Sequence, residues 1–160
     1  MAYLVNSQAK VIMKNQLGEN LHINTEWIVE ALQEFDKTIK LIAEDIPVDI
    51  FGILGLRNLS SFVGEVFAKQ LESASGGLLK SNPHQDGYPD LLLIDKHGKK
   101  LLDNITNHGM MSAKEPFSPF ANGGVEVKAT CGSVPTPAQL TKKGLVKPGI
   151  GDQRIDMITT

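Results

Sequence analysis

Three charged residues stand in apolar stretches where packing alone does not require them. Asp90 opens the run "DLLLI", and Glu126 and Lys128 flank a single valine in "VEVKATC". A buried charge is costly unless something pairs with it. Two carboxylates are hard oxygen ligands of the kind that Mg²⁺ binds together with water and substrate phosphate. The set therefore predicts phosphodiester hydrolysis, in which the ion polarises the phosphoryl oxygen and activates water and the lysine positions that water and offsets developing charge.

Two strands must position these side chains. The turn signal "NGG" at residues 122–124 precedes "VEVKATC", whose alternation places Glu126 and Lys128 on one face and the valines on the other. "YPDLLLID" reads as a mostly buried strand, with Pro89 tolerated only at its start or on an edge. If the two strands are neighbours, Asp90 lies close to Glu126 and Lys128.

Two amphipathic helices are expected upstream of these strands. Apolar residues recur at helical spacing over residues 25–44 and again over residues 59–73. At 100° per residue, Glu65 falls on the side of the second helix opposite its apolar stripe. Glu65 therefore faces either solvent or a cleft, and a glutamate on the polar face of a helix is ordinarily just solvated.

The remaining segments are shorter. "LLKS" predicts a strand, and "KHGKK" predicts a turn that leads into "LLDNI" as the second half of a hairpin. Residues 107–124 contain two prolines and show no sustained hydrophobic periodicity, which predicts a long irregular insertion. The closing "RIDMIT" predicts a strand, and since no helix follows it, we expect the chain to be a fragment of a longer protein.

Composition limits the function classes. The 160 residues are 41% hydrophobic and 21% charged, which is typical of one soluble globular domain. The formal net charge of -2 excludes a strongly basic coat for nucleic acid, so DNA contacts must be local. Residues 129–151 contain no Asp or Glu, and their lysines are the predicted DNA contacts: Lys142, Lys143 and Lys147. A loop kept soluble by lysines explains the same pattern.

Other features argue against several alternatives. A single cysteine, Cys131, excludes an internal disulfide and a cysteine-based zinc site and favours the cytoplasm; it reads as a small buried filler. The N-terminus has neither a signal peptide nor a membrane span. The four histidines lack the i, i+4 spacing of a helical metal site, so a His-based nuclease is disfavoured.

"PD" at Pro89 and Asp90, followed by "EVK" at residues 126–128, resembles the active-site signature of the PD-(D/E)xK nuclease superfamily. Many members carry a glutamate on a helix beside the catalytic strands, and Glu65 in "VGEVFAKQL" resembles that element. The resemblance implies that Asp90 and Glu126 bind Mg²⁺ and that the Val127 carbonyl completes the coordination.

In the same resemblance Lys128 assists the attacking water. The interval between Asp90 and Glu126 is longer than usual, which leaves Asp86 as the alternative acid. The implied fold is α/β, with a central mixed sheet flanked by helices. Residues 1–57 form an N-terminal helical extension and residues 58–160 the nuclease core.

Within the superfamily, type II restriction endonucleases best fit the long insertion and the helical extension. This resemblance implies a prokaryotic cytoplasmic homodimer that cuts double-stranded DNA at a specific sequence and acts beside a cognate DNA methyltransferase, with no membrane partner. Two alternatives stay open. One is a structure-selective repair or junction-resolving nuclease with the same catalytic residues. The other is a non-catalytic DNA-binding or oligomerisation domain, whose acids form ion pairs with Lys128 or Arg154 and are indifferent to Mg²⁺.

Overall fold

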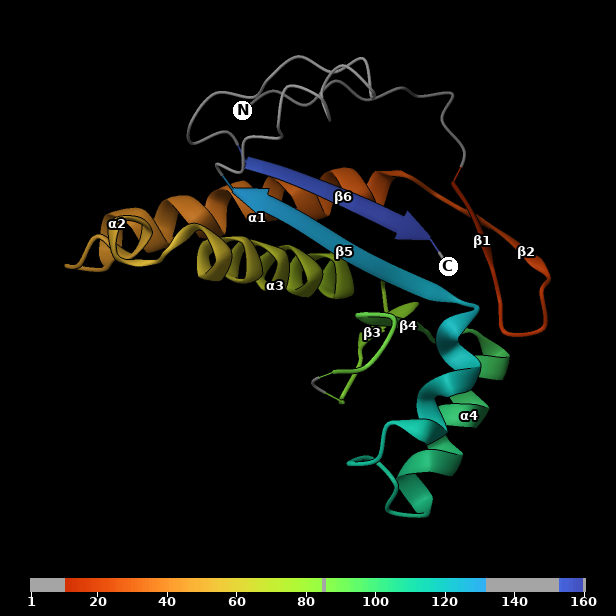
Figure 1. Cartoon of the computed structure of the whole chain (residues 1–160). Coiled ribbons are helices and arrows are strands. Elements are labelled where there is room, and N and C mark those ends of the chain that lie inside the picture. Colours follow the sequence, from red (N-terminus) through yellow and green to blue (C-terminus); the bar gives the residue numbers. More distant parts are fainter. Residues whose placement is uncertain (1–10, 85, 132–152, 160) are drawn as a thin grey trace, which may run out of the picture.

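The computed structural model describes residues 11–84, 86–131 and 153–159. Across these ranges the chain forms helices packed on two sheets, one of two strands and one of four (Figure 1). The predicted α/β class is confirmed. The predicted mixed sheet was wrong for the described strands, because they all pair antiparallel. Side chains alternate with period two in both kinds of sheet, so a sequence pattern does not reveal strand direction.

Both predicted amphipathic helices are confirmed, as α1 (Glu26–Asp45) and α3 (Leu56–Ala74). They lie side by side, and the rings of Phe35 and Phe67 meet edge to face with centroids 6.0 Å apart (Figure 1). Aromatic pairs prefer this arrangement because the positive edge of one ring meets the negative face of the other. The two apolar stripes therefore form a helix-helix contact within one chain. None of the described helices combines the length and the apolar character needed to cross a membrane.

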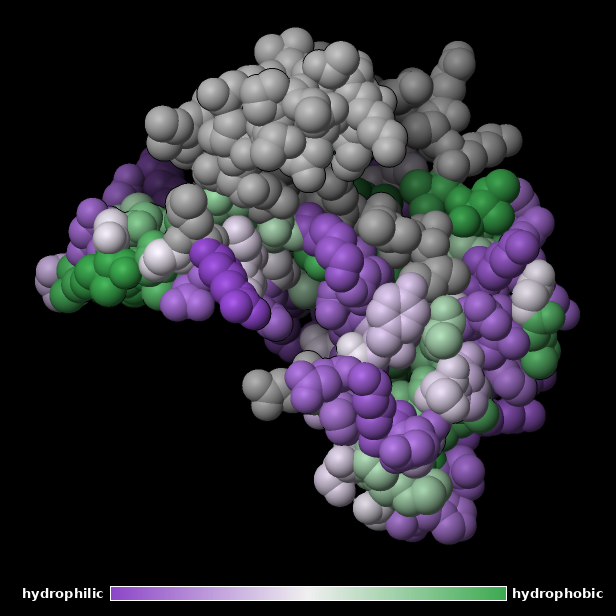
Figure 2. Space-filling view, in the orientation of Figure 1, coloured by the Kyte–Doolittle hydropathy of each residue, from purple (hydrophilic) through white to green (hydrophobic). Residues whose placement is uncertain are grey.

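A short helix, α2 (Ile50–Ile53), occupies the connection between α1 and α3. The Asp49 side chain caps it by accepting a hydrogen bond from the Gly52 N–H at 2.9 Å. Large apolar side chains around this corner are exposed, and we call Ile46, Val48 and Ile53 the helical tip. Figure 2 shows hydrophobic surface at the end of the molecule where α2 lies.

The predicted division of the chain between residues 57 and 58 falls inside α3. The larger hydrophobic core also joins residues from both sides of that position, among them Met13, Ile23 and Phe35 from one side and Val63 and Leu91 from the other. The N-terminal part contributes strands as well as helices, so its description as helical was incomplete.

Those strands form an antiparallel hairpin of β1 (Val11–Lys14) and β2 (Asn20–Ile23), which we did not predict. The buried side chain of Asn15 organises its turn. The Asn15 Oδ1 accepts hydrogen bonds from the backbone N–H groups of Leu17 and Glu19 at 3.0 and 2.9 Å. Side-chain amides commonly stabilise turns in this way.

The four-stranded sheet has the order β3-β4-β5-β6. The predicted strands are confirmed as β3 (Leu79–Ser81), β4 (Leu91–Leu93), β5 (Gly124–Cys131) and β6 (Gln153–Thr159). Helix α3 covers the valine face of β5 (Figure 1). The two elements approach closely at Gly64, where an added Cβ would lie 3.5 Å from the Cβ of Ala129.

The predicted hairpin after β4 was wrong, because residues Lys96–Asn107 form helix α4. Asp95 caps this helix, since its Oδ1 accepts hydrogen bonds from the N–H groups of His97 and Gly98 at 3.0 and 2.7 Å. Leu102 and Ile105 lie three residues apart on one face and are buried. The turn signal that we assigned to Gly98 instead allows close packing, because a Cβ there would lie 2.0 Å from the Leu93 carbonyl oxygen.

The predicted irregular excursion contains a 3₁₀ helix, η1 (Glu115–Ala121), and packs against α4. Its two phenylalanines join a second, smaller core whose buried members are Leu92, Leu102, Ile105, Phe117 and Phe120. The part of this insertion that forms η1 therefore packs over Leu92 of β4.

Candidate active site

Asp90 and Glu126 are held together by reciprocal hydrogen bonds. The backbone N–H of Val127 donates to Asp90 Oδ2 at 2.7 Å, and the backbone N–H of Asp90 donates to Glu126 Oε2 at 3.3 Å. These contacts follow from strand pairing, because the register Leu91 with Val125, continued by one residue, places Asp90 opposite Glu126. The structure therefore brings the two predicted acids together.

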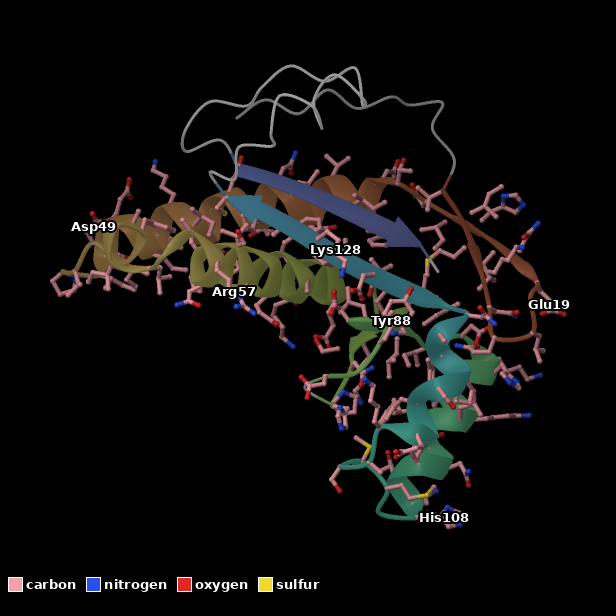
Figure 3. The ribbon with its side chains drawn as sticks, in the orientation of Figure 1. Glu19, Asp49, Arg57, Tyr88, His108 and Lys128 are labelled. Carbon is pink, nitrogen blue, oxygen red and sulfur yellow. The ribbon has the colours of Figure 1, made fainter. Side chains whose placement is uncertain are left out.

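Lys128 lies beside this pair. Its Nζ atom donates a hydrogen bond to Glu126 Oε1. The Lys128 side chain is 58% exposed and that of Glu126 12% exposed, so the ammonium stands at the surface over a mostly covered carboxylate. Figure 3 shows Lys128 projecting from β5 near Tyr88. The predicted alternation on β5 is confirmed, since Val125 and Val127 are buried in the core.

The electrostatics of Asp90 show that its charge is poorly compensated. Burial raises the pKa of the Asp90 carboxyl above its ordinary value of 3.8, and the carboxylates of Glu126 and Glu65 raise it further. The Val127 N–H and the Lys128 ammonium oppose this shift. Like charges and low solvent exposure both disfavour the ionised form, so a bound cation would relieve an unfavourable concentration of negative charge.

The surroundings of Lys128, in contrast, favour its charged form. Its hydrogen bond to Glu126 raises the pKa of the ammonium, although partial burial opposes the shift. An amine whose pKa is raised further above neutrality stays protonated. Lys128 is consequently a fixed positive charge and a hydrogen-bond donor.

The Val127 carbonyl is oriented toward the Asp90 side of β5. In an antiparallel ladder a residue directs its N–H and C=O to the same neighbour, and the Val127 N–H points to Asp90. Continuing the β4–β5 register by two residues from Leu91 and Val125 places Pro89 opposite Val127. Proline has no N–H, so Pro89 cannot donate the ladder hydrogen bond that the Val127 carbonyl would otherwise accept.

Glu65 and Asp86 occupy different positions. Glu65 is exposed on α3, close enough to contribute to the raised pKa of Asp90. Asp86 is exposed in the loop between β3 and β4, where its backbone N–H donates to the Nδ1 atom of His84 at 3.2 Å. Asp90, and not the alternative acid Asp86, makes the contacts with Val127 and Glu126.

Asn82, which we did not predict, fixes the loop that carries Asp90. Its N–H donates to the Asp90 carbonyl at 2.8 Å and its Nδ2 to the Pro89 carbonyl at 3.0 Å. Its Oδ1 accepts from the His84 N–H at 3.0 Å. The dipeptide Asn82-Pro83 is a turn signal that could have indicated this role.

The remaining predicted residues add no groups to this cluster. Lys142, Lys143 and Lys147 lie outside the described residues. Cys131 is buried, its backbone N–H donates to the Ser60 hydroxyl at 3.0 Å, and burial raises the pKa of its thiol. This is the packing expected of a small filler.

Metal ligation here depends on few side chains. Over the described ranges, no group of three or more His, Cys, Asp and Glu side chains is arranged to hold a metal ion. The donors present are the carboxylates of Asp90 and Glu126 and the Val127 carbonyl. They are all hard oxygens, and Mg²⁺ is commonly bound by one or two carboxylates while water and substrate phosphates fill its other positions. The donor set therefore fits Mg²⁺ in kind.

Comparisons with protein-family models, with curated proteins and with solved structures found no match to this chain. The geometry of Asp90, Glu126, Val127 and Lys128 is therefore the basis for proposing a function.

Proposed function

We propose that this protein is a magnesium-dependent DNA endonuclease of the PD-(D/E)xK type that hydrolyses phosphodiester bonds at a specific sequence. The observation that carries the proposal is the pair of reciprocal hydrogen bonds between Asp90 and the Glu126-Val127 segment, with Lys128 beside them. An ion pair between Lys128 and Glu126 that served only folding would not require a second acid, Asp90, at the same place. A cation that interacts with both acids gives that arrangement a function.

In this proposal Asp90, Glu126 and the Val127 carbonyl hold Mg²⁺, which polarises a phosphoryl oxygen and lowers the pKa of bound water when present. The backbone N–H groups of Asp90 and Val127 fix the orientation of both carboxylates, so little reorganisation accompanies binding. Lys128 is protonated at neutral pH, and its role is to orient the attacking water and stabilise charge on the phosphorane. Glu65 adds negative charge from α3.

Double-stranded DNA is the proposed partner, with Lys142, Lys143 and Lys147 as its backbone contacts. Cutting both strands of a symmetric site needs two active centres, so we propose a homodimer. The exposed helical tip at the end of α1 and α2 is a candidate contact (Figure 2). In a restriction system, a cognate DNA methyltransferase would protect the host sites.

Digestion of unmethylated phage DNA with Mg²⁺ tests the proposal. We expect discrete fragments from the wild-type chain, none from Asp90→Ala or Lys128→Ala, and unchanged fragments from the matched control Asp86→Ala. A smear without discrete bands would indicate a structure-selective nuclease. Absence of magnesium-dependent cleavage by the wild type would overturn the nuclease reading.

A second readout does not require cleavage. The ion pair between Lys128 and Glu126 is also what a non-catalytic DNA-binding domain would contain. Ligand that binds only the folded state raises the unfolding temperature. We therefore expect millimolar Mg²⁺ to raise the melting temperature of the wild type and to leave that of Asp90→Ala unchanged, whereas a structural ion pair predicts no Mg²⁺ effect on either chain.

A further inference from the structure

Tyr88 differs from every other aromatic residue that the structure describes. Tyr88 is 46% exposed, whereas the described phenylalanines and the tryptophan are buried or half-buried. Large aromatic side chains stabilise a fold by burying their surface, and Tyr88 buries a smaller fraction of its surface than they do. Its exposure therefore needs another explanation.

The backbone on both sides of Tyr88 is tightly held. The Gly87 N–H donates to the His84 carbonyl at 2.8 Å, and a Cβ at Gly87 would lie 2.3 Å from Asn82 Nδ2. Pro89 is fully buried, and its carbonyl accepts a hydrogen bond from Asn82. The chain thus holds Tyr88 in a packed, hydrogen-bonded segment while leaving nearly half of the residue exposed, as suits a residue that contacts a ligand.

Tyr88 also lies beside the candidate active site. It is two residues before Asp90, and continuation of the β4–β5 register places it opposite Lys128. The Tyr88 phenol is close enough to contribute to the raised pKa of Lys128, and Figure 3 shows the two side chains next to each other. A phenolic O–H and an ammonium are both donors. Together they offer two hydrogen-bond donors to an anion at the surface of this site.

We propose that the Tyr88 hydroxyl donates a hydrogen bond to a phosphate oxygen of the DNA strand next to the bond that is cut. This inference rests on the proposed nuclease function and adds a substrate-binding residue to it. Tyrosine is among the side chains that bind phosphate oxygens and so position a protein on DNA. Because hydrogen bonds hold the backbone on both sides of Tyr88 before DNA arrives, binding has little of this segment left to order.

The test compares Tyr88→Phe, which removes only the hydroxyl, with the wild type. The probe is a fluorescein-labelled duplex containing the cleavage site mapped in the phage digest, and binding is measured by anisotropy without added metal. We expect Tyr88→Phe to weaken binding about tenfold, as for loss of one hydrogen bond to a charged group. Under single-turnover cleavage, the half-saturating concentration should rise by a similar factor and the maximal rate should change less than threefold.

A modified substrate locates the contact. Each phosphate is replaced in turn by an uncharged methylphosphonate. At one position next to the scissile bond, the replacement should weaken DNA binding by the wild type and should change DNA binding by Tyr88→Phe much less. Equal affinity of both chains for the unmodified duplex would overturn the role of Tyr88, and retained wild-type cleavage would leave the nuclease function standing. A wild type that neither binds nor cuts DNA would overturn both.

Discussion

The two ends of strand β4 each carry an aspartate, and the two aspartates differ in how their charge is satisfied. Asp95, after the strand, accepts hydrogen bonds from the N–H groups of His97 and Gly98 and from Asn15 Nδ2, the last at 3.3 Å. Asp90, before the strand, accepts one from Val127 and lies near Glu126 and Glu65.

The difference separates a stabilising carboxylate, Asp95, from Asp90, for which we propose a role in function. Asp95 joins the N-terminal hairpin to the start of α4, so its hydrogen bonds contribute to folding. Asp90 lies in an environment that disfavours its charge, and proteins retain such arrangements where a ligand uses them. We therefore expect the Asp95 end of β4 to govern stability and the Asp90 end to govern activity.

The largest expected effect is on catalysis. Asp90→Ala should reduce magnesium-dependent DNA cleavage by about 10²-fold or more, the scale seen when one group that stabilises a transition state is removed. Its urea unfolding midpoint should stay at or above that of the wild type. Rates come from timed plasmid digests. Residual cleavage within about threefold of the wild type would remove Asp90 from the active site.

Gly98→Ala should act on stability alone. The added Cβ would lie 2.0 Å from the Leu93 carbonyl oxygen, so the backbone must shift where α4 leaves the sheet. Overpacking of this kind costs about 1–3 kcal/mol. Chemical unfolding gives this free energy, and cleavage by the folded fraction should be unchanged. A neutral substitution would show that the α4 end of the strand is loosely packed.

Asp95→Ala should destabilise the protein by about 1–2 kcal/mol, because α4 loses its cap and the buried Asn15 loses one of its acceptors. Asp95→Asn, which keeps an acceptor, is the matched control and should recover much of this loss. Thermal unfolding of the three chains provides the measurement. If Asp95→Ala unfolded at the same temperature as the wild type but no longer cleaved DNA, Asp95 would act in cleavage and the contrast between the two ends of β4 would be wrong.

Asp90→Asn should stabilise the metal-free protein slightly, by about 0.5 kcal/mol after allowance for its partial exposure. The sign follows from the raised pKa. The folded chain binds the Asp90 proton more tightly than the unfolded chain, so Asp90 costs stability as pH rises from its ordinary value of 3.8 through the raised folded value. This cost persists at neutral pH, and the amide removes it.

Urea unfolding at pH 4 and pH 7 checks this prediction. The stability difference between Asp90→Asn and the wild type should be larger at pH 7 than at pH 4, and millimolar Mg²⁺ should reduce it by stabilising only the wild type. A variant that is less stable than the metal-free wild type at pH 7 would contradict the reading of Asp90 as an uncompensated charge.

Long periodic segments could be predicted from the sequence, and short ones could not. The stripes of α1 and α3 repeat over several turns, so their pattern excludes other structures. Helix α4 has only a short apolar repeat, and its first turn contains Gly98, so local turn chemistry suggested a hairpin. The better indication of a helix was Asp95, which caps α4. Gly98, three residues later, marks close packing against β4 and not a turn.

The site was predictable where it depends on strand alternation. Period two places Glu126 and Lys128 on one face of β5, and neighbouring strands bring Asp90 to them. The contacts of Asn82, and the position of Tyr88 for which we propose a role, were missed because they depend on the conformation of a loop, which no periodicity specifies. The β1–β2 hairpin was missed because the turn that joins its short strands depends on the Asn15 side chain.

The hydrogen bond from the Val127 N–H to Asp90 gives the protein an intrinsic spectroscopic reporter. An amide proton bonded to a carboxylate changes its resonance frequency when that carboxylate gains a proton or a cation. The single peak of Val127 in an amide correlation spectrum should therefore follow both events at the candidate site, in solution and without substrate. An isotope-labelled wild-type sample, with no substitution, is thus enough to follow proton and cation binding at Asp90.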